Sequence, residues 1–284
     1  MALTINTNVA SLLVQKNLEA ATSSLNTAIE RMTTGFKINS AKDDAAGMAV
    51  AIKLDTQLSS YDVASQNVAM GSSLLTTVEE NEELVLGHLQ RIRDLAEQAA
   101  NGAYSTDSKA AIAAEIDSRV AEINRLSESV EFNGIKLLDG SKTSLNIQVG
   151  INGGDVIDIG GSMGSTSATA LLGGTYGGTA AGTEIVDGVS DTATAADVLT
   201  AVDGAINTIK DRITKIGAFQ NRLDSAAESI EVAQTNITSA LSTVRDADVS
   251  TESSNYIKAQ ILQQASATLL TTANQTPSIA LNLL

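Results

Sequence analysis

The sequence has no cysteine and no tryptophan, a single proline, a single histidine and only 2% aromatic residues. Without cysteine there is no disulfide, no thiol nucleophile and no thiolate metal site. One histidine rules out a zinc site of the His-Glu-x-x-His type and leaves any transition metal with one imidazole. No stretch resembles the nucleophile elbow of a hydrolase. We therefore predict no enzyme activity, no bound cofactor and no metal site.

Basic residues and long apolar runs are also scarce. The chain carries 18 Lys and Arg against 33 Asp and Glu, which gives a net charge of −15. This balance argues against binding to nucleic acid or to an anionic membrane surface. No apolar stretch is long enough to predict a membrane-spanning helix, so we expect no membrane insertion. The N-terminus lacks the features of a secretory signal peptide, so an extracellular location would require a different export route.

Aliphatic residues recur instead at the alternating three- and four-residue spacing of a coiled-coil seam. The first seam consists of Val14, Leu18, Ala21, Leu25, Ala28 and Met32. The second is interrupted only by Glu82 and consists of Leu75, Val78, Val85, Leu89, Ile92, Ala96 and Ala99. The third consists of Leu223, Ala226, Ile230, Ala233, Ile237, Ala240 and Val244. These seams predict long helices that pack side by side, and matching seams near both ends predict that the N- and C-terminal helices pair.

Turn and cap residues divide the helical parts of the chain. Gly35 suits the left-handed conformation that ends a helix. Ser40 and Asp43 have the spacing of a capping box, which predicts that the second helix begins at about residue 43. Asn101 and Gly102 predict its end. A further amphipathic helix follows, with apolar residues at Ile112, Ile116, Val120, Ile123 and Leu126.

The middle of the chain has a different pattern. Apolar and polar residues alternate on both sides of an Asn-Gly-Gly-Asp turn, which predicts a β-hairpin. Its apolar residues are Leu145, Ile147, Val149, Ile151, Val156, Ile157 and Ile159. Residues 160–188 are rich in Gly, Ser, Thr and Ala and predict a loop-rich or weakly ordered surface segment.

For His88 and for the acidic residues 79–83, the sequence allows either a functional or a purely structural interpretation. His88 lies in a helical stretch, where a lone histidine is more often structural or exposed to solvent than a metal ligand. The sequence "EENEE" at residues 79–83 could form a cation site. We favour a solvated helix face, because Ca²⁺ sites need oxygen atoms that converge from a loop.

The stretch from Ala259 to Leu284 contains no charged residue. About half of its residues are Gln, Asn, Ser or Thr and Pro277 interrupts it, which argues against a membrane helix. Its many leucines argue against a disordered tail. An assembly helix packed by partners on several sides fits best, because buried charge is costly whereas neutral polar groups can be hydrogen-bonded. Its predicted apolar face consists of Ile261, Leu262, Ala265, Leu269, Leu270 and Ala273.

Several longer motifs resemble one family, the bacterial flagellins, and they occur in order along both terminal thirds of the chain. They are "INTNVASL" at 5–12, "RMTTGFKINSAKDDAAGMAVA" at 31–51, "LQRIRDLAEQAANG" at 89–102, "EFNGIKLLDG" at 131–140 and "AQILQQAS" at 259–266. The resemblance implies a structural subunit that self-assembles into the helical flagellar filament for swimming motility. It also implies type III export to the extracellular flagellum, and as partners many copies of the chain itself, the flagellar cap and hook-associated proteins and an export chaperone.

The resemblance also implies a host partner. Flagellins recognised by Toll-like receptor 5 share a motif that matches residues 89–98, together with a glutamate that matches Glu115. The positions implied here are Leu89, Gln90, Arg91, Asp94, Leu95, Gln98 and Glu115. Asp94 departs from the pattern, because the family often has glutamate at this position.

The predicted fold is mainly α: a long antiparallel helical coiled-coil bundle from both termini, with a small β-hairpin region and a loop-rich central insertion. We predict a terminal coiled-coil domain (1–42 plus 246–284), a helical bundle with the hairpin (43–160 plus 195–245) and a short variable surface segment (161–194). The predicted subunit-assembly residues are Val14, Leu18, Leu25, Met32, Ile230, Ile237, Ile261, Leu262, Leu269 and Leu270. The alternative function is an acidic signalling coiled coil of the chemoreceptor cytoplasmic-hairpin type, although such a hairpin has a tight tip rather than strands and a glycine-rich stretch.

Overall fold

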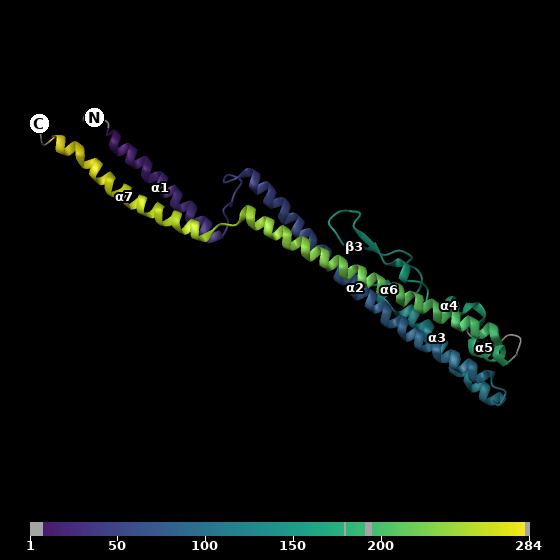
Figure 1. Cartoon of the computed structure of the whole chain (residues 1–284). Helices are drawn as coiled ribbons and strands as arrows, with labels where there is room; N and C mark the ends of the chain where they lie inside the picture. Colours follow the sequence, from purple (N-terminus) through teal and green to yellow (C-terminus); the bar gives the residue numbers. More distant parts are fainter. Residues whose placement is uncertain (1–7, 179, 191–194, 282–284) are drawn as a thin grey trace. The chain divides into compact units, whose positions relative to one another are not determined.

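The computed structural model describes residues 8–178, 180–190 and 195–281 and divides into two compact units (Figure 1). Unit 1 consists of residues 1–58 and 235–284, and unit 2 consists of residues 59–234. The long helices α2 (Ala45–Ala100) and α6 (Ala195–Arg245) contribute residues to both units. The predicted domain boundaries, at residues 42/43 and 245/246, differ from these unit boundaries, because they fall before the start of α2 and after the end of α6. The predicted division into domains stays a prediction.

Unit 1 contains the pair of terminal helices, α1 (Val9–Thr34) and α7 (Val249–Leu281), which lie side by side (Figure 1). The pair is antiparallel: the Asn8 amide donates to the Ala273 carbonyl at one end, and Arg31 pairs with Glu252 at the other. Ala21 and Ala28 of the predicted first seam are buried between the helices. The prediction that the terminal helices pair is therefore confirmed. Helix α7 continues past Pro277, so the prediction that this proline interrupts the helix was wrong.

Helix ends in unit 1 are fixed by specific caps. Gly35 has φ 75°, and its N–H donates to the Arg31 carbonyl, as the sequence predicts. The predicted capping box is wrong, however. Asp43 accepts from the N–H of Ser40 within a turn, whereas Asp44 accepts from the first free N–H groups of α2, at a distance of 3.0 Å from each nitrogen. Asp248 caps α7 in the same way.

The connector between α1 and α2 is hydrogen-bonded to the connector between α6 and α7. Phe36 and Asp246 form an antiparallel bridge, flanked by hydrogen bonds from Lys37 N–H to the Arg245 carbonyl and from Ala247 N–H to the Gly35 carbonyl. The Arg245 guanidinium lies 4.1 Å from the centroid of the Phe36 ring. Backbone hydrogen bonding therefore continues where both helices have ended.

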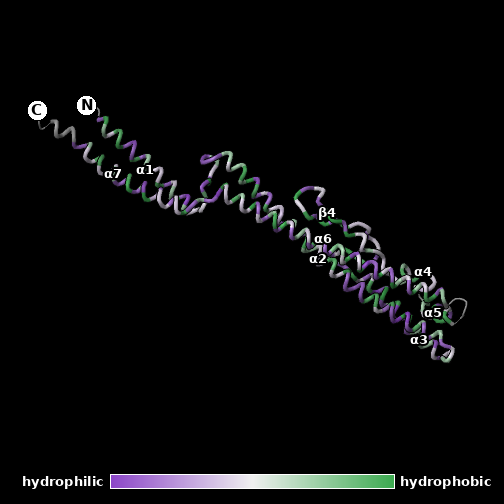
Figure 2. The backbone as a smooth tube through the Cα atoms, in the orientation of Figure 1, coloured by the Kyte–Doolittle hydropathy of each residue, from purple (hydrophilic) through white to green (hydrophobic). Residues whose placement is uncertain are grey.

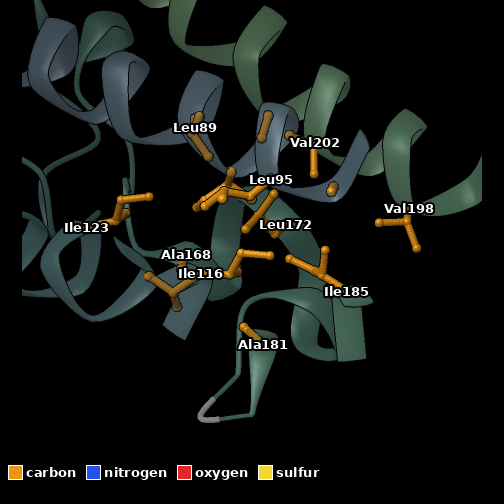
Figure 3. Close-up of a cluster of buried hydrophobic side chains, with 14 of the residues drawn as sticks. Leu89, Leu95, Ile116, Ile123, Ala168, Leu172, Ala181, Ile185, Val198 and Val202 are labelled. Carbon is orange, nitrogen blue, oxygen red and sulfur yellow. The ribbon is translucent and has the colours of Figure 1, made fainter. Parts of the chain in front are cut away.

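Unit 2 is a bundle of α2, α6 and α3 (Thr106–Ser129), with two smaller helices packed on α3. Apolar residues recur at intervals along the long helices rather than gathering in one block (Figure 2). All seven apolar positions of the predicted second seam are buried, as are the five predicted on α3. Leu89, Leu95, Ile116 and Leu172 lie in one cluster (Figure 3).

The central segment differs from its prediction. Residues 168–190 contain α4 (Ala168–Tyr176) and α5 (Ala181–Ser190), and both helices contribute buried residues to the core. Gly182 lies so close to α3 that an added Cβ would collide with the Ala113 carbonyl. A loop-rich surface segment was therefore the wrong expectation for these residues. Residues 179 and 191–194 of the predicted segment lie outside the described residues.

Two short antiparallel hairpins lie between α3 and α4. Strands β1 (Glu131–Phe132) and β2 (Ile135–Lys136) flank Asn133 and Gly134, whose positive φ values of 50° and 76° suit a tight hairpin turn. Strands β3 (Asn146–Gln148) and β4 (Val156–Asp158) pair with Ile147 opposite Ile157, which confirms the predicted hairpin. A 3₁₀ helix, Gly160–Ser162, follows. In the part of the chain that the structure describes, no helix is both long and apolar enough to cross a membrane.

Candidate assembly surface and a buried ion pair

The paired terminal helices expose many of their large apolar side chains. Leu13 on α1 is 60% exposed, and Ile261 on α7 is 59% exposed. The other exposed members are Val9, Leu12, Ile29, Met32, Val249, Ile257, Leu262 and Leu269. We call these ten residues the outer apolar set. A single chain thus leaves in water a group of side chains whose burial stabilises proteins by about 1.5–3 kcal/mol each.

The inner face of α7 consists of small or polar residues. Glu252, Ala259 and Ser266 are buried and lie seven residues apart, so they form one stripe along α7. This stripe was not predicted from the sequence, because it contains none of the large aliphatic residues that mark a seam. Its only sequence signal is the spacing of seven residues between its members. The predicted apolar face of α7 includes Ile261, Leu262 and Leu269, and none of these is buried in the single chain.

The remaining predicted assembly residues fall into two groups. Val14, Leu18, Leu25, Ile237 and Leu270 are half-buried within unit 1. Ile230 is buried in the core of unit 2 and cannot contact another chain without rearrangement. The structure therefore places most of the predicted residues on the terminal helices, whereas Ile230 and Ile237 lie on α6.

An open groove of about 760 Å³ runs between α1 and α7. Its walls are lined mainly by small side chains and two leucines, among them Ala20, Ser24, Thr27, Leu262, Ala265 and Leu269. At one end, a 3.1 Å ion pair joins Arg31 to Glu252, whose side chain is 9% exposed. Most of the lining residues are thus neutral, and Lys258 is the further charged residue among them.

Unit 2 contains a buried carboxylate at Glu82. The predicted solvated face of residues 79–83 is therefore wrong at this position, whereas Glu80 and Glu83 are exposed. The Glu82 side chain is fully buried, and its Oε1 accepts from Thr166 Oγ1 at 3.1 Å and from Arg212 Nη1 at 3.3 Å. Burial raises the pKa of Glu82 above its usual range, and the Arg212 charge opposes that rise. Arg212 also donates to the carbonyl oxygens of Gly164 and Ser165.

His88 is half-buried and lies 3.4 Å from Arg119, measured from Nδ1 to Nη1. Burial lowers the pKa of His88, and the nearby Arg119 charge lowers it further. This environment fits the structural explanation of the histidine. In the described ranges, no three His, Asp or Glu side chains lie close enough together to hold a metal ion.

Two family models match the chain. The bacterial flagellin N-terminal helical region matches residues 5–143, and the bacterial flagellin C-terminal helical region matches residues 199–284. The chain belongs to the bacterial flagellin family. The matched regions include α1, α2 and α3 on one side and most of α6 and α7 on the other.

Individual relatives agree with this assignment. A flagellin of Listeria innocua is 33% identical over 99% of both chains. A B-type flagellin of Pseudomonas aeruginosa is 47% identical over 60% of this chain, but that match spans only 35% of the relative. Among solved structures, a putative flagellar hook-associated protein from Vibrio parahaemolyticus has a similar fold. Its TM-score is 0.60 at 17% identity, and the match covers 72% of this chain and all of the other.

Family membership establishes the type of function. Flagellins form a structural protein family, and this flagellin is a subunit that polymerises into the flagellar filament. The chemoreceptor-type coiled coil is not favoured, because both terminal regions of the chain match flagellin models.

The residues that the resemblance associates with Toll-like receptor 5 lie on α2 and α3 of this flagellin. Gln90, Arg91, Asp94 and Gln98 are exposed on α2. Arg91 donates to Glu115 on α3, with 3.1 Å between Nε and Oε1, and this hydrogen bond lowers the pKa of Glu115. By contrast, both leucines of the motif, Leu89 and Leu95, are buried in the core. The candidate receptor surface is therefore polar.

Proposed function

We propose that the outer apolar set and the groove between α1 and α7 form the surface through which copies of this flagellin bind one another in the filament. The observation that carries the proposal is the exposure of ten large apolar side chains on one helix pair. Exposed large apolar side chains scattered singly are normal on soluble proteins, but ten of them on one helix pair mark a candidate interaction surface. The mostly neutral lining of the groove supports the same use, because Arg31 and Glu252 are paired with each other and Lys258 is the one further charged residue among those that line it.

Replacing two members of the outer apolar set should weaken polymerisation strongly. In a variant with Ile261→Ser and Leu269→Ser, we expect seeded filament growth to require a subunit concentration at least about tenfold higher than wild type. Each replacement removes about 1.5–3 kcal/mol of apolar burial per subunit. Growth can be followed by light scattering and electron microscopy. Gln260→Ser with Gln264→Ser alters two exposed polar positions of the same helix and should grow like wild type. Equal filament growth by the two variants would contradict the proposed assembly surface.

We also propose that Toll-like receptor 5 recognises this flagellin through the exposed polar residues of α2 and Glu115. The exposure of Arg91 and Gln98 supports this, as does the ion pair that holds Arg91 in place. Arg91→Ala should reduce potency in a receptor reporter assay by about tenfold or more, since Arg is often a strong contributor at interfaces. Lys109→Ala, on α3, is the control. Unchanged potency of Arg91→Ala would contradict the proposal.

We infer from family membership that this flagellin is secreted through the flagellum's own export channel and is extracellular in the filament. The cap protein, the hook-associated proteins and an export chaperone are the further partners that we propose. Recovery of the intact chain from sheared extracellular filaments would support this location, and recovery only from the cytoplasm would contradict it.

A further inference from the structure

The two longest helices of unit 2 each carry one charged residue within an otherwise apolar heptad seam. On α2 the seam positions are Leu75, Val78, Glu82, Val85, Leu89, Ile92, Ala96 and Ala99. On α6 the corresponding spacing gives Val198, Val202, Ala205, Ile209, Arg212, Ile216, Phe219 and Leu223. Glu82 and Arg212 are therefore the single interruptions of their two seams.

These two interruptions meet. Glu82 Oε1 lies 3.3 Å from Arg212 Nη1, and the two side chains are 0% and 16% exposed. A third stretch of chain joins them, because Arg212 Nη1 also donates to Thr166 Oγ1 and to the Gly164 carbonyl, while Nη2 donates to the Ser165 carbonyl. One guanidinium thus holds α2, α6 and residues 164–166 together.

Other polar links between α2 and α6 lie closer to the surface. Arg93 pairs with Asp203, Gln220 donates to Glu79, and Gln234 donates to Asp62. Their positions show that the two helices run antiparallel with residue 82 opposite residue 212. Because these side chains reach water, they could lose or change partners at little cost.

An apolar seam that repeats every seven residues does not by itself fix how far one helix slides along the other. A slip of one heptad would again place apolar residues opposite apolar residues. It would, however, place Glu82 opposite Ala205 or Phe219 and Arg212 opposite Leu75 or Leu89. Two buried charges would then lack partners, which is strongly unfavourable.

We propose that the Glu82–Arg212 pair is a register pin, which selects one alignment of α2 and α6 rather than adding net stability. A buried polar residue at a seam position has this role in coiled coils. The geometry of the pair fits selection better than stabilisation, because Glu82 Oε2 is buried and has no hydrogen-bond partner. The pin gives every copy the same outer contour, which a helical polymer of identical subunits requires.

The alignment of α2 and α6 can be measured directly. Because the chain has no cysteine, two cysteines can be introduced and each labelled with a spin label without any competing site. Gln66 on α2 and Asn207 on α6 are exposed and lie outside the cluster. In the observed alignment they are about 30 Å apart along the helix axis, and a one-heptad slip changes that separation by about 10 Å. Pulsed electron paramagnetic resonance of the labelled full-length monomer resolves such a change.

The variant combines Glu82→Leu with Arg212→Leu, which makes both seams continuous. We expect helical content like that of wild type and a second distance population displaced by about 10 Å. The control, Glu79→Leu with Gln220→Leu, removes a link between the same helices near the surface and should keep the single wild-type distance. One unchanged distance in the Glu82 and Arg212 variant overturns the proposal.

Glu82→Met with Arg212→Met provides a second variant with flexible side chains, in case leucine packs poorly. The same displaced distance is expected. Failure of both variants to reach wild-type helical content would also overturn the proposal, since the pair would then be needed for stability rather than for alignment. The distance is measured in the monomer, so the result does not depend on the proposed assembly surface.

Discussion

Removal of residues 259–284 is expected to abolish filament formation and to leave unit 2 folded. The truncation removes two buried residues of the inner stripe, Ala259 and Ser266, and three members of the outer apolar set, Ile261, Leu262 and Leu269. Both buried clusters of unit 2 are built without any residue beyond Ile230. The part of the chain lost in the truncation therefore contributes to assembly and not to that core. Electron microscopy after seeding measures filament formation, and hydrogen exchange measures the protection of α2, α3 and α6.

A matched control separates composition from pattern in this truncation. A full-length chain whose residues 259–284 are scrambled keeps the neutral composition but loses the spacing of seven between Glu252, Ala259 and Ser266. We expect this chain to fail in assembly as well, because large side chains would then be forced against α1. Filaments of normal length from the truncated chain would contradict the assignment of α7 as an assembly helix.

Arg212→Ala is expected to lower the free energy of unfolding of unit 2 by about 3–5 kcal/mol at neutral pH. The reason is that Glu82 would stay buried without its charge partner, and breaking a buried pair costs this much. Denaturant unfolding followed by circular dichroism measures the loss. Arg222→Ala is the matched control on the same helix. Arg222 lies 5.7 Å from the centroid of the Phe219 ring and is exposed, so its removal should cost about 1 kcal/mol or less.

The cost of Arg212→Ala should depend on pH in a direction opposite to that of most carboxylates in the chain. The folded pKa of Glu82 is raised by burial, so its protonation stabilises the fold below the unfolded pKa, and that stabilisation is lost as pH rises through the folded pKa. Without Arg212 the pKa rises further. The loss should therefore be smaller near pH 5 than near pH 7.

The other perturbed carboxylates provide a contrast in the same experiment. Hydrogen bonds from backbone N–H groups lower the pKa of Asp158, so its contribution is lost as pH falls. Asp158 is present in both chains, and the difference between wild type and Arg212→Ala isolates Glu82. A loss that is equal at both pH values, or equal to that of Arg222→Ala, would contradict the role of the pair.

The long helices could be predicted from sequence because their signal is local. An apolar residue at every third or fourth position marks the buried face of a helix wherever the partner lies. The seam from Leu75 to Ala99 was found in this way. The helix end at Gly35 was predicted from the preference of glycine for the left-handed conformation, which is also a local signal. The environment of Glu82 could not be found, because its partner Arg212 lies 130 residues further along the chain. A charged residue within an apolar seam indicates only that some partner balances its charge, and it does not identify that partner.

Helices α4 and α5 were missed for a different physical reason. Their sequences are rich in Gly, Ser and Thr, which have low helix propensity, so contacts with α3 must hold them. Asn124 accepts from the N–H of Ala168 at 2.9 Å, and Asp117 accepts from the N–H of Gly182 at 2.6 Å. Both α3 residues bind the beginning of a helix, where the N–H groups lack partners. Such tertiary caps leave no periodic pattern in the sequence.

The stripe of Glu252, Ala259 and Ser266 has a consequence for the growth of the polymer. The terminal helix pair buries small or polar residues between its helices and leaves the outer apolar set exposed. If neighbouring subunits cover this set, as we propose, the stability of the pair rises with the number of neighbours. A subunit at the growing tip has neighbours on one side only. Its terminal helices are therefore held more weakly than those of subunits along the shaft. The most recently added subunit should therefore dissociate most easily, and the addition of the next subunit should stabilise it.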